Sequence, residues 1–286
     1  MDEFVLLTLD AAPCGLRAPV LACRDALAAA GAKVDTVAAV SDDDVDRALD
    51  RLPDARLIVA AAADGQVRAV VRRLVRRYAP PPTDRPADLP ADRTVPDLPA
   101  LGVLPLGPDG VGLVARLGLP AAPAEVAAAV LGGGTRRLDL LRNEGGSVTL
   151  DGALLGGIDA QGQVVPFAAR VEVDDALLAD GSEPLVAAAV ANGDGYTAVD
   201  GLPLVTRADA ADGVLDVAVA IPVTARSPLG RRRPRFEVRR ARGRAVAVNP
   251  RAEVQFVDDG VAGTLARKRT WWMERAAWAV YVVSRK

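Results

Sequence analysis

The apolar pattern of this chain changes its period at Gly132-Gly133-Gly134, and this change constrains the fold more than any other feature. Before these glycines, short apolar runs alternate with alanine-rich segments of helical period, which is typical of β-α-β units in a Rossmann-like, mostly parallel sheet. After them, apolar residues recur at every second position between Gly and Asp-Gly turns, which is typical of antiparallel strands. We therefore expect an α/β domain at residues 1–134 and an all-β domain, a β-sandwich, at residues 135–286.

The first part has a regular order of predicted elements. Strands are expected at residues 4–9, 34–39, 56–61 and 101–104. Helices are expected at residues 17–30, 42–52, 66–78 and 124–131, and Ser41 suits the N-cap of the second helix. Residues 79–99 contain seven prolines and are expected to form a long exposed loop. Because open α/β sheets leave a crevice at the carboxyl ends of their strands, a ligand should bind at that edge.

The second part shows several short runs with alternating apolar residues. Strands are expected at residues 147–150, 164–173, 185–191, 214–221, 236–240 and 245–248.

Composition excludes several kinds of chemistry and of partner. The chain has no histidine, which excludes Ser-His-Asp and Cys-His catalysis and zinc sites with histidine ligands. Its 35 basic and 37 acidic residues give a net charge of −2, so no global field attracts nucleic acid, and none is expected as a partner. No apolar run approaches the roughly 20 residues that span a bilayer, and the acidic start of the chain is unlike a signal peptide. We therefore expect a cytoplasmic protein, with Cys14 and Cys23 as reduced, idle thiols.

Several segments carry a resemblance to a known family when they are taken in order. They are residues 101–107 (LGVLPLG) with 117–120 (LGLP), 137–140 (RLDL), 190–193 (VANG) with 208–217 (ADAADGVLDV), and 242–244 (RGR) with 254–260 (VQFVDDG). Together they resemble the catalytic fold of diacylglycerol kinases and sphingosine kinases, which is related to NAD kinase. The resemblance covers nearly the whole chain.

The resemblance implies a lipid kinase that transfers phosphate from ATP, with Mg²⁺ as cofactor, to a lipid hydroxyl. By the positions that match, Asp64, Gly65, Gly107 and Asn192 would bind the nucleotide. The metal would be held by Asp212 and Asp216, for which an ordinary Asp-Gly turn followed by a solvated aspartate is the alternative. Asp259 would act as the general base.

The chain departs from the family at its phosphate-binding loops. The family's Gly-Gly-Asp-Gly-Thr loop reads Ala62-Ala63-Asp64-Gly65-Gln66 here, so two methyl groups stand where phosphate would approach the backbone. The Gly-Thr-x-Asn-Asp loop becomes residues 107–111 (GPDGV), and the glutamate expected after Asp259-Gly260 is Val261. Phosphoryl transfer depends on positioning, so these losses leave two hypotheses open. One is an active lipid kinase, and the other is a relative without turnover that binds nucleotide or lipid in a regulatory role. A purely structural interaction protein is a third.

Three further clusters have competing interpretations. Asp42-Asp43-Asp44 is interpreted as favourable charge at a helix N-terminus and not as a metal cluster. Nine arginines lie within residues 226–244; they form either a solvated loop or a patch that contacts anionic lipid, which would place the protein peripherally at a membrane. Trp271, Trp272 and Trp278 either fill a terminal strand's core, the favoured interpretation, or anchor at a membrane interface.

Overall fold

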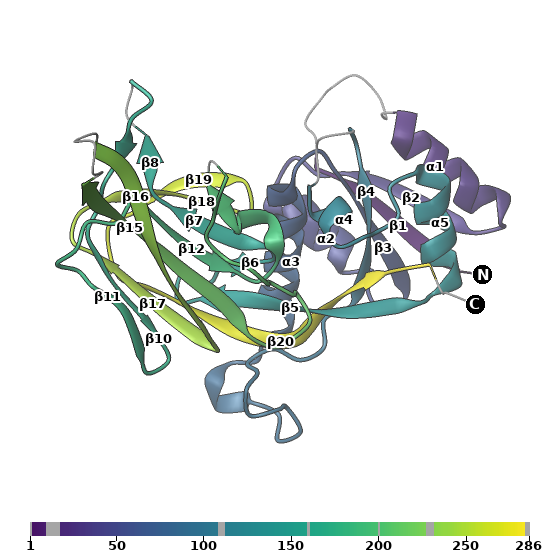
Figure 1. The fold of residues 1–286 in the computed structure, drawn as a ribbon. Coiled ribbons are helices and arrows are strands. Elements are labelled where there is room, and N and C mark those ends of the chain that lie inside the picture. Colours follow the sequence, from purple (N-terminus) through teal and green to yellow (C-terminus); the bar gives the residue numbers. More distant parts are fainter. Residues whose placement is uncertain are drawn as a thin grey trace. The chain divides into compact units, whose positions relative to one another are not determined.

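A computed structural model describes residues 2–9, 18–107, 112–158, 161–199, 201–226 and 232–283 of the chain. The chain forms two compact units (Figure 1). Unit 1 contains the residues up to Leu138 together with those from Ala276 on, and unit 2 contains Asp139–Arg275. The first boundary between the units lies four residues after the expected boundary at residue 134. The last residues of the chain belong to unit 1 again. No helix in the described ranges is long and apolar enough to cross a membrane.

Unit 1 is a parallel sheet with helices on its faces. The strands lie in the order β20-β4-β3-β1-β2 and every neighbouring pair is parallel. Its elements are β1 (Glu3–Thr8), α1 (Ala18–Ala29), β2 (Lys33–Ala38), α2 (Asp42–Leu49), β3 (Ala55–Ala61), α3 (Asp64–Tyr78), η1 (Pro82–Asp84), β4 (Ala100–Pro105), α4 (Gly112–Arg116), α5 (Pro123–Gly132) and the end of β20 (Arg269–Tyr281). The expected strands and helices are therefore present, with ends shifted by a few residues.

One face of the unit 1 sheet is covered by α1 and α5. Apolar residues of these helices, among them Leu27 and Val130, share a buried core with Phe4 of β1 and Ile58 of β3. Close packing explains Gly102 in β4, because a Cβ atom there would lie 2.8 Å from a methyl group of Val130. Cys23 also belongs to this core, and burial raises the pKa of its thiol to about 11, so it is an idle thiol as expected. Cys14 lies outside the described residues.

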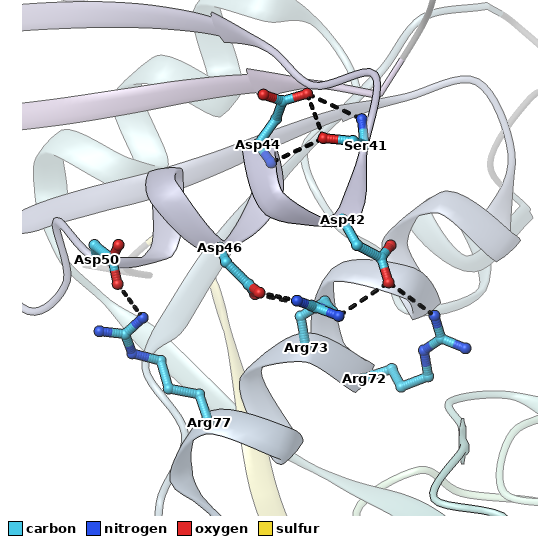
Figure 2. Close-up of polar contacts among 8 residues, drawn as sticks. All are labelled: Ser41, Asp42, Asp44, Asp46, Asp50, Arg72, Arg73 and Arg77. Carbon is cyan, nitrogen blue, oxygen red and sulfur yellow. Dashed lines mark hydrogen bonds and ion pairs between the residues drawn. The ribbon is translucent and has the colours of Figure 1, made fainter.

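The acidic run at residues 42–44 begins α2, as the sequence indicates. Ser41 accepts a hydrogen bond from the Asp44 amide while the Asp44 carboxylate accepts one from the Ser41 amide, a complete capping box. The Ser41 hydroxyl also donates to the Asp44 carboxylate at 2.8 Å, and this hydrogen bond is the main cause that lowers the pKa of Asp44 to about 2. Figure 2 shows this cap.

Salt bridges join α2 to α3. The acidic partners lie one turn apart on α2, and Figure 2 shows them facing arginines of α3. The pairs are Asp42 with Arg72 and Arg73, Asp46 with Arg73, and Asp50 with Arg77.

The proline-rich loop at residues 79–99 is only partly the exposed loop expected from the sequence. Its first half is exposed, but Val95 and Leu98 are buried, and the buried Arg93 guanidinium donates to the Val95 carbonyl and pairs with Asp97. The expectation was therefore wrong for the second half. Proline forbids regular hydrogen bonding but not burial, and side chains supply the missing partners.

Unit 2 is a β-sandwich, as expected. One sheet has six strands in the order β16-β15-β12-β7-β18-β19, and the other contains β11-β10-β17-β20 with β5 and β6. The elements are β5 (Thr135–Asn143), β6 (Val148–Thr149), β7 (Gly152–Leu155), β8 (Gly157–Ile158), β9 (Val164–Val165), β10 (Ala169–Val173), β11 (Ala176–Asp180), β12 (Ala187–Ala191), η2 (Asp194–Tyr196), β13 (Ala198–Val199), β14 (Leu202–Pro203), β15 (Leu215–Arg226), β16 (Arg232–Gly243), β17 (Ala245–Pro250), β18 (Val254–Asp258), β19 (Val261–Leu265) and the start of β20.

The sandwich core is formed by inward residues of both sheets. Val190, Val217 and Phe256 from the six-stranded sheet share one buried cluster with Val248 and Trp271 from the other. Trp271 and, in unit 1, Trp278 are fully buried, which confirms the core interpretation for these two tryptophans. β5 and β20 each continue from one unit into the other.

Candidate functional site

The loop after β3 is closed by its own glutamine. The Ala62 amide donates to the Gln66 side-chain oxygen at 2.6 Å, and the Gln66 side-chain nitrogen donates to the Leu9 carbonyl at 3.2 Å. Gln66 therefore occupies the Ala62 amide at this edge of the sheet. Ala62 and Ala63 add two methyl groups to the same turn.

Asp64 and Gly65 form the first turn of α3. The Asp64 carboxylate accepts a hydrogen bond from the Leu113 amide at 3.0 Å and forms a salt bridge with Arg116 at 2.8 Å. An internal carboxylate thus holds the start of α4, where an anion would otherwise be attracted. The structure brings Asp64 close to the segment that follows β4, but it gives Asp64 a structural partner.

Gly107 lies next to an apolar cavity at the carboxyl edge of the unit 1 sheet. The cavity has a volume of about 430 Å³. Its lining consists of Pro19, Pro105, Leu106, Gly107, Val114, Ala115, Leu119, Ala121 and Pro123. A Cβ atom at Gly107 would meet no atom within 4 Å, so there is open space beside this glycine. None of the lining side chains is charged or polar, so they offer no partner for a triphosphate.

In unit 2, Asp212 and Asp216 lie together at the start of β15. Arg242 on the neighbouring strand binds both: it forms a salt bridge with Asp212, and its Nε lies 3.0 Å from Asp216. Burial raises the pKa of Asp216, Arg242 lowers it and the charge of Asp212 raises it. The pair thus already holds a cation, the guanidinium.

These two carboxylates do not fit a magnesium site in this arrangement. Mg²⁺ requires near-octahedral oxygen coordination, whereas Arg242 uses an oxygen of each carboxylate. One oxygen of Asp216, Oδ2, is buried without a hydrogen-bond partner. In the described part of the chain, no three Asp, Glu, Cys or His residues are grouped so that they could hold a metal ion.

Asn192 ends β12 in a buried position. Its side-chain amide donates to the Asp139 carbonyl at 3.0 Å and to the Leu150 carbonyl at 2.6 Å. Its Oδ1 atom has no hydrogen-bond partner among the described residues, so Asn192 keeps one open acceptor. This acceptor cannot receive a phosphate oxygen, because phosphate oxygens at neutral pH are acceptors themselves.

Asp259 lies in the turn between β18 and β19 and is almost completely buried. Its carboxylate accepts three backbone hydrogen bonds, from the amides of Leu150 at 2.7 Å, Asp151 at 2.9 Å and Gly152 at 3.2 Å. The neighbouring Asp258 accepts the Thr149 hydroxyl at 2.8 Å. Both carboxylates thus fasten this turn to residues 149–152, at the end of β6 and the start of β7.

The comparisons agree with this fold. Residues 16–143 match the diacylglycerol kinase catalytic domain. This match covers 128 of the 286 residues, a little under half of the chain. The search of the curated proteins gave no match.

Solved structures of diacylglycerol kinases share the architecture of this chain over nearly its whole length. A crystal structure of a diacylglycerol kinase from Bacillus anthracis str. Sterne matches with a TM-score of 0.66 and 15% identity, covering 99% of this chain and 97% of that chain. A second structure from the same organism, also assigned to a diacylglycerol kinase, gives a TM-score of 0.69 and 16% identity with the same coverage. At such identities the likeness concerns the fold.

The structure also reveals residues that the sequence analysis missed. Asp139 of β5 is fully buried, and its carboxylate accepts the Gly213 amide at 2.6 Å, which ties the Asp-Gly turn to the strand. A charged residue inside the apolar run 138–141 (LDLL) was the available signal. Arg242 was seen only as one arginine of a basic run. Nothing in the sequence indicated that it pairs with Asp212 and Asp216.

Proposed function

We propose that this protein is a diacylglycerol kinase relative without phosphoryl transfer that acts by binding, with a lipid as its ligand. The observation that carries the proposal is the closed loop after β3, in which the Gln66 side chain takes the Ala62 amide. A nucleotide phosphate could bind there only after that hydrogen bond broke and two methyl groups gave way. The described residues that line the apolar cavity beside Gly107 add no polar side chain that could bind a triphosphate.

The groups of unit 2 support the same proposal. Asp259, which would be the general base, has its carboxylate engaged by three backbone amides. Arg242 neutralises the aspartates that would hold Mg²⁺. Because phosphoryl transfer depends almost entirely on positioning and charge neutralisation, the loss of several such groups removes catalysis while the fold persists.

A second candidate is the family's own activity, ATP-dependent phosphoryl transfer to a lipid hydroxyl with Mg²⁺. The match of residues 16–143 to the family favours it, as does the proximity of Asp212 and Asp216. This activity would require Gln66 to release the Ala62 amide and Mg²⁺ to displace Arg242. With this activity, the protein would be a kinase of the wider fold group that includes NAD kinase.

The test is a transfer assay with radiolabelled ATP and Mg²⁺, with diacylglycerol and sphingoid bases as acceptors, at high enzyme concentration. We expect no labelled lipid, and isothermal titration calorimetry should show no binding of ATP. Labelled lipid above the no-enzyme background would overturn the proposal in favour of the second candidate.

A repaired variant makes the negative result informative. The triple change Ala62→Gly, Ala63→Gly and Gln66→Thr restores the family's loop and should raise ATP affinity from undetectable to measurable, because it removes the methyl groups and the competing amide. Ala87→Gly with Ala91→Gly is a matched control in the exposed half of the 79–99 loop and should leave ATP binding unchanged. If the repaired loop also binds no ATP, the loop is not the obstacle and the argument from Gln66 is wrong.

A further inference from the structure

The six-stranded sheet of unit 2 ends in a free edge strand, β19 (Figure 1). Among the described strands, β19 is paired only with β18. A two-residue turn, Asp259-Gly260, joins the two strands, with φ values of 47° and 78°. Positive φ at both positions is typical of a type I′ turn, whose flanking residues form a hydrogen-bonded pair. Asp258 and Val261 are therefore such a pair, and this fixes which backbone groups of β19 face β18.

Two residues of β19 direct their backbone groups away from β18. Hydrogen-bonded pairs recur at every second residue, so the odd-numbered residues of β19 bond to β18, and Ala262 and Thr264 face outward. The same alternation is seen on the other side of β18, where the Gln255 carbonyl accepts the Gly156 amide next to β7. The described residues provide no backbone partner for the outward N–H and C=O groups of Ala262 and Thr264.

β19 lacks the features that usually protect a free edge. Its sequence, Val-Ala-Gly-Thr-Leu, contains neither a charged residue nor a proline. Three other edge strands of the two large sheets all carry charged residues, which are Lys33 and Asp35 on β2, Asp180 on β11, and Glu237 and Arg239 on β16. Unlike these three, β19 can take up a further strand without burying a charge.

The backbone of β19 is complementary to itself about a two-fold axis at Gly263. In an antiparallel pairing of two copies centred on this glycine, Ala262 lies opposite the partner's Thr264, and the two residues exchange backbone hydrogen bonds. The axis repeats the same pair on its other side. Every outward N–H and C=O group of these residues would then have a partner, which an exposed edge otherwise lacks.

The side chains fit the same pairing. Val261 is 45% exposed and belongs to no buried cluster of unit 2. The two-fold register places it opposite the partner's Leu265. In each copy Leu265 is buried in the sandwich core, so Val261 would lie at the edge of the second core and lose apolar surface to it.

The two ends of β19 differ in charge. Arg267 and Lys268 follow the strand and are exposed. At the other end, the Gly260 amide of the turn donates to the hydroxyl of Tyr196 in η2, and η2 begins with the exposed Asp194. Antiparallel pairing brings the turn of each copy to the basic end of the other, so opposite charges meet at both ends. A strand of another protein would satisfy the backbone but would not explain this match.

We propose that β19 forms the interface of a two-fold dimer, in which the β19 strands of two copies of this chain pair in antiparallel fashion and join their six-stranded sheets. Because each copy uses its one β19 edge, the assembly closes at two copies and does not grow into a fibre. One short strand from each copy gives a small interface, so the dimer should be weak and should form only at high protein concentration. The proposal does not depend on whether the protein transfers phosphate.

The first test is sedimentation velocity of the full chain at concentrations up to about 1 mM, the range of weak complexes. We expect the average mass to rise from that of a monomer toward that of a dimer. The change Ala262→Lys with Thr264→Lys should raise the dissociation constant at least about tenfold, because like charges would lie directly opposite each other. Thermal unfolding should stay unchanged, since both side chains are exposed.

A matched control adds the same charge to another edge. Ala176→Lys with Leu177→Lys alters two exposed residues of β11 and should leave the dimer as strong as in the unaltered protein. Equal weakening by the control would overturn the proposal. A protein that stays monomeric at the highest concentration would leave β19 to a strand of another protein, and this result would overturn it as well.

The second test addresses the register. Ala262→Cys and Thr264→Cys are purified separately, mixed and oxidised, and disulfide-linked dimers are measured on a non-reducing gel beside the unaltered protein. The mixture should give several-fold more linked dimer than either variant alone, because position 262 lies about 5.5 Å from the partner's position 264 between Cα atoms. Equal positions lie about 7–8 Å apart, too far for a disulfide. Equal yields in the mixture and in the single variants would contradict the two-fold pairing.

Discussion

Both α3 and β16 are rich in arginine, with five in the 15 residues of α3 and six in the 12 residues of β16, but the two elements use them differently. On α3, Arg72, Arg73 and Arg77 all pair with aspartates of α2 or with its C-cap, Asp50 (Figure 2). On the inner part of β16, residues 237–243, Arg239 and Arg242 pair with carboxylates, while Arg235 on the outer part, before residue 237, has no acidic partner among the described residues.

The difference comes from the geometry of the two elements. On α2, Asp42, Asp46 and Asp50 are spaced by four residues, so they form one row on the helix that the arginines of α3 can meet. Along β16, neighbouring side chains alternate between the two faces of the sheet, and the strand runs past the sandwich, so its arginines lie at different levels and meet different surroundings. A basic run in a strand therefore cannot be assigned one role.

The largest effect is expected for the inner part of β16, with Arg242→Gln. This change leaves Asp212 and the buried Asp216 close together without a cation, and it should lower the free energy of unfolding by about 2 kcal/mol at neutral pH. Denaturant unfolding followed by circular dichroism measures the change. The matched control, Arg207→Gln, alters an exposed arginine in the same unit and should change little.

The same variant has a predicted pH dependence. Because burial raises the pKa of Asp216 above its ordinary value, this group stabilises the fold only in its protonated form. Its contribution is fully present below the unfolded-state pKa and is lost as the pH rises through the raised folded-state pKa. Removal of Arg242 raises that pKa further, so the stability deficit of Arg242→Gln should shrink as the pH falls from about 7 to about 4. A deficit that stays constant would show that Asp216 is not the source.

A smaller effect is expected on α3 for Arg73→Gln. The Arg73 guanidinium binds both Asp46 and Asp42, at 2.8 and 2.9 Å, and its side chain is only 16% exposed. Loss of these two contacts should cost about 1.5 kcal/mol, more than an ordinary surface pair, and part of the loss should disappear in high salt. Thermal unfolding at low and high salt measures both. A cost equal to that of Arg76→Gln, an exposed neighbour, would show that the row of pairs contributes nothing.

A substitution in the N-cap of α2 tests the contribution of helix capping apart from that of the salt bridges. Ser41→Ala removes the hydroxyl that accepts the Asp44 amide and should cost about 1 kcal/mol. The change also removes the hydrogen bond that the Ser41 hydroxyl donates to the Asp44 carboxylate. The measurement is the same thermal unfolding, and here salt should have little influence because neither lost contact joins two charges. Ser41→Thr, which retains a capping hydroxyl, should recover most of the stability.

The smallest effect belongs to the outer part of β16. Arg235→Gln should change the free energy of unfolding by less than about 0.5 kcal/mol, because its side chain is exposed and supports no core. Chemical denaturation beside Arg242→Gln gives the comparison within one strand. A cost similar to that of Arg242→Gln would contradict the division of β16 into an inner and an outer part.

Much of the fold follows from local pattern. The helix at α2 was predictable because Ser41 and the aspartates after it are N-terminal signals that act within one turn. The sandwich followed from the alternating residues after Gly134, because period two leaves few alternatives to a sheet. The resemblance placed Asp212 and Asp216 together through their shared turn.

The candidate site was harder to predict because its decisive contacts join distant residues. Gln66 was seen as a replacement for a threonine, but its bonds to Ala62 and Leu9 depend on how β1 and β3 lie side by side. Asp259 was chosen by its place in a motif, and only the structure shows the amides of Leu150 and Asp151 around it. Sequence spacing identifies which groups are present, whereas their availability for chemistry depends on tertiary contacts.

The return of β20 to unit 1 sets an order for biosynthesis. Ala279 and Val280 pair with Ala100 and Leu101 along β4, and the Leu98 amide donates to the Ala277 carbonyl. The ribosome therefore releases the whole of unit 2 before the strand that completes the sheet of unit 1 exists. During that interval the edge of β4 is an open template for other strands, so a nascent chain stalled before Ala276 should depend on chaperones to stay free of aggregation.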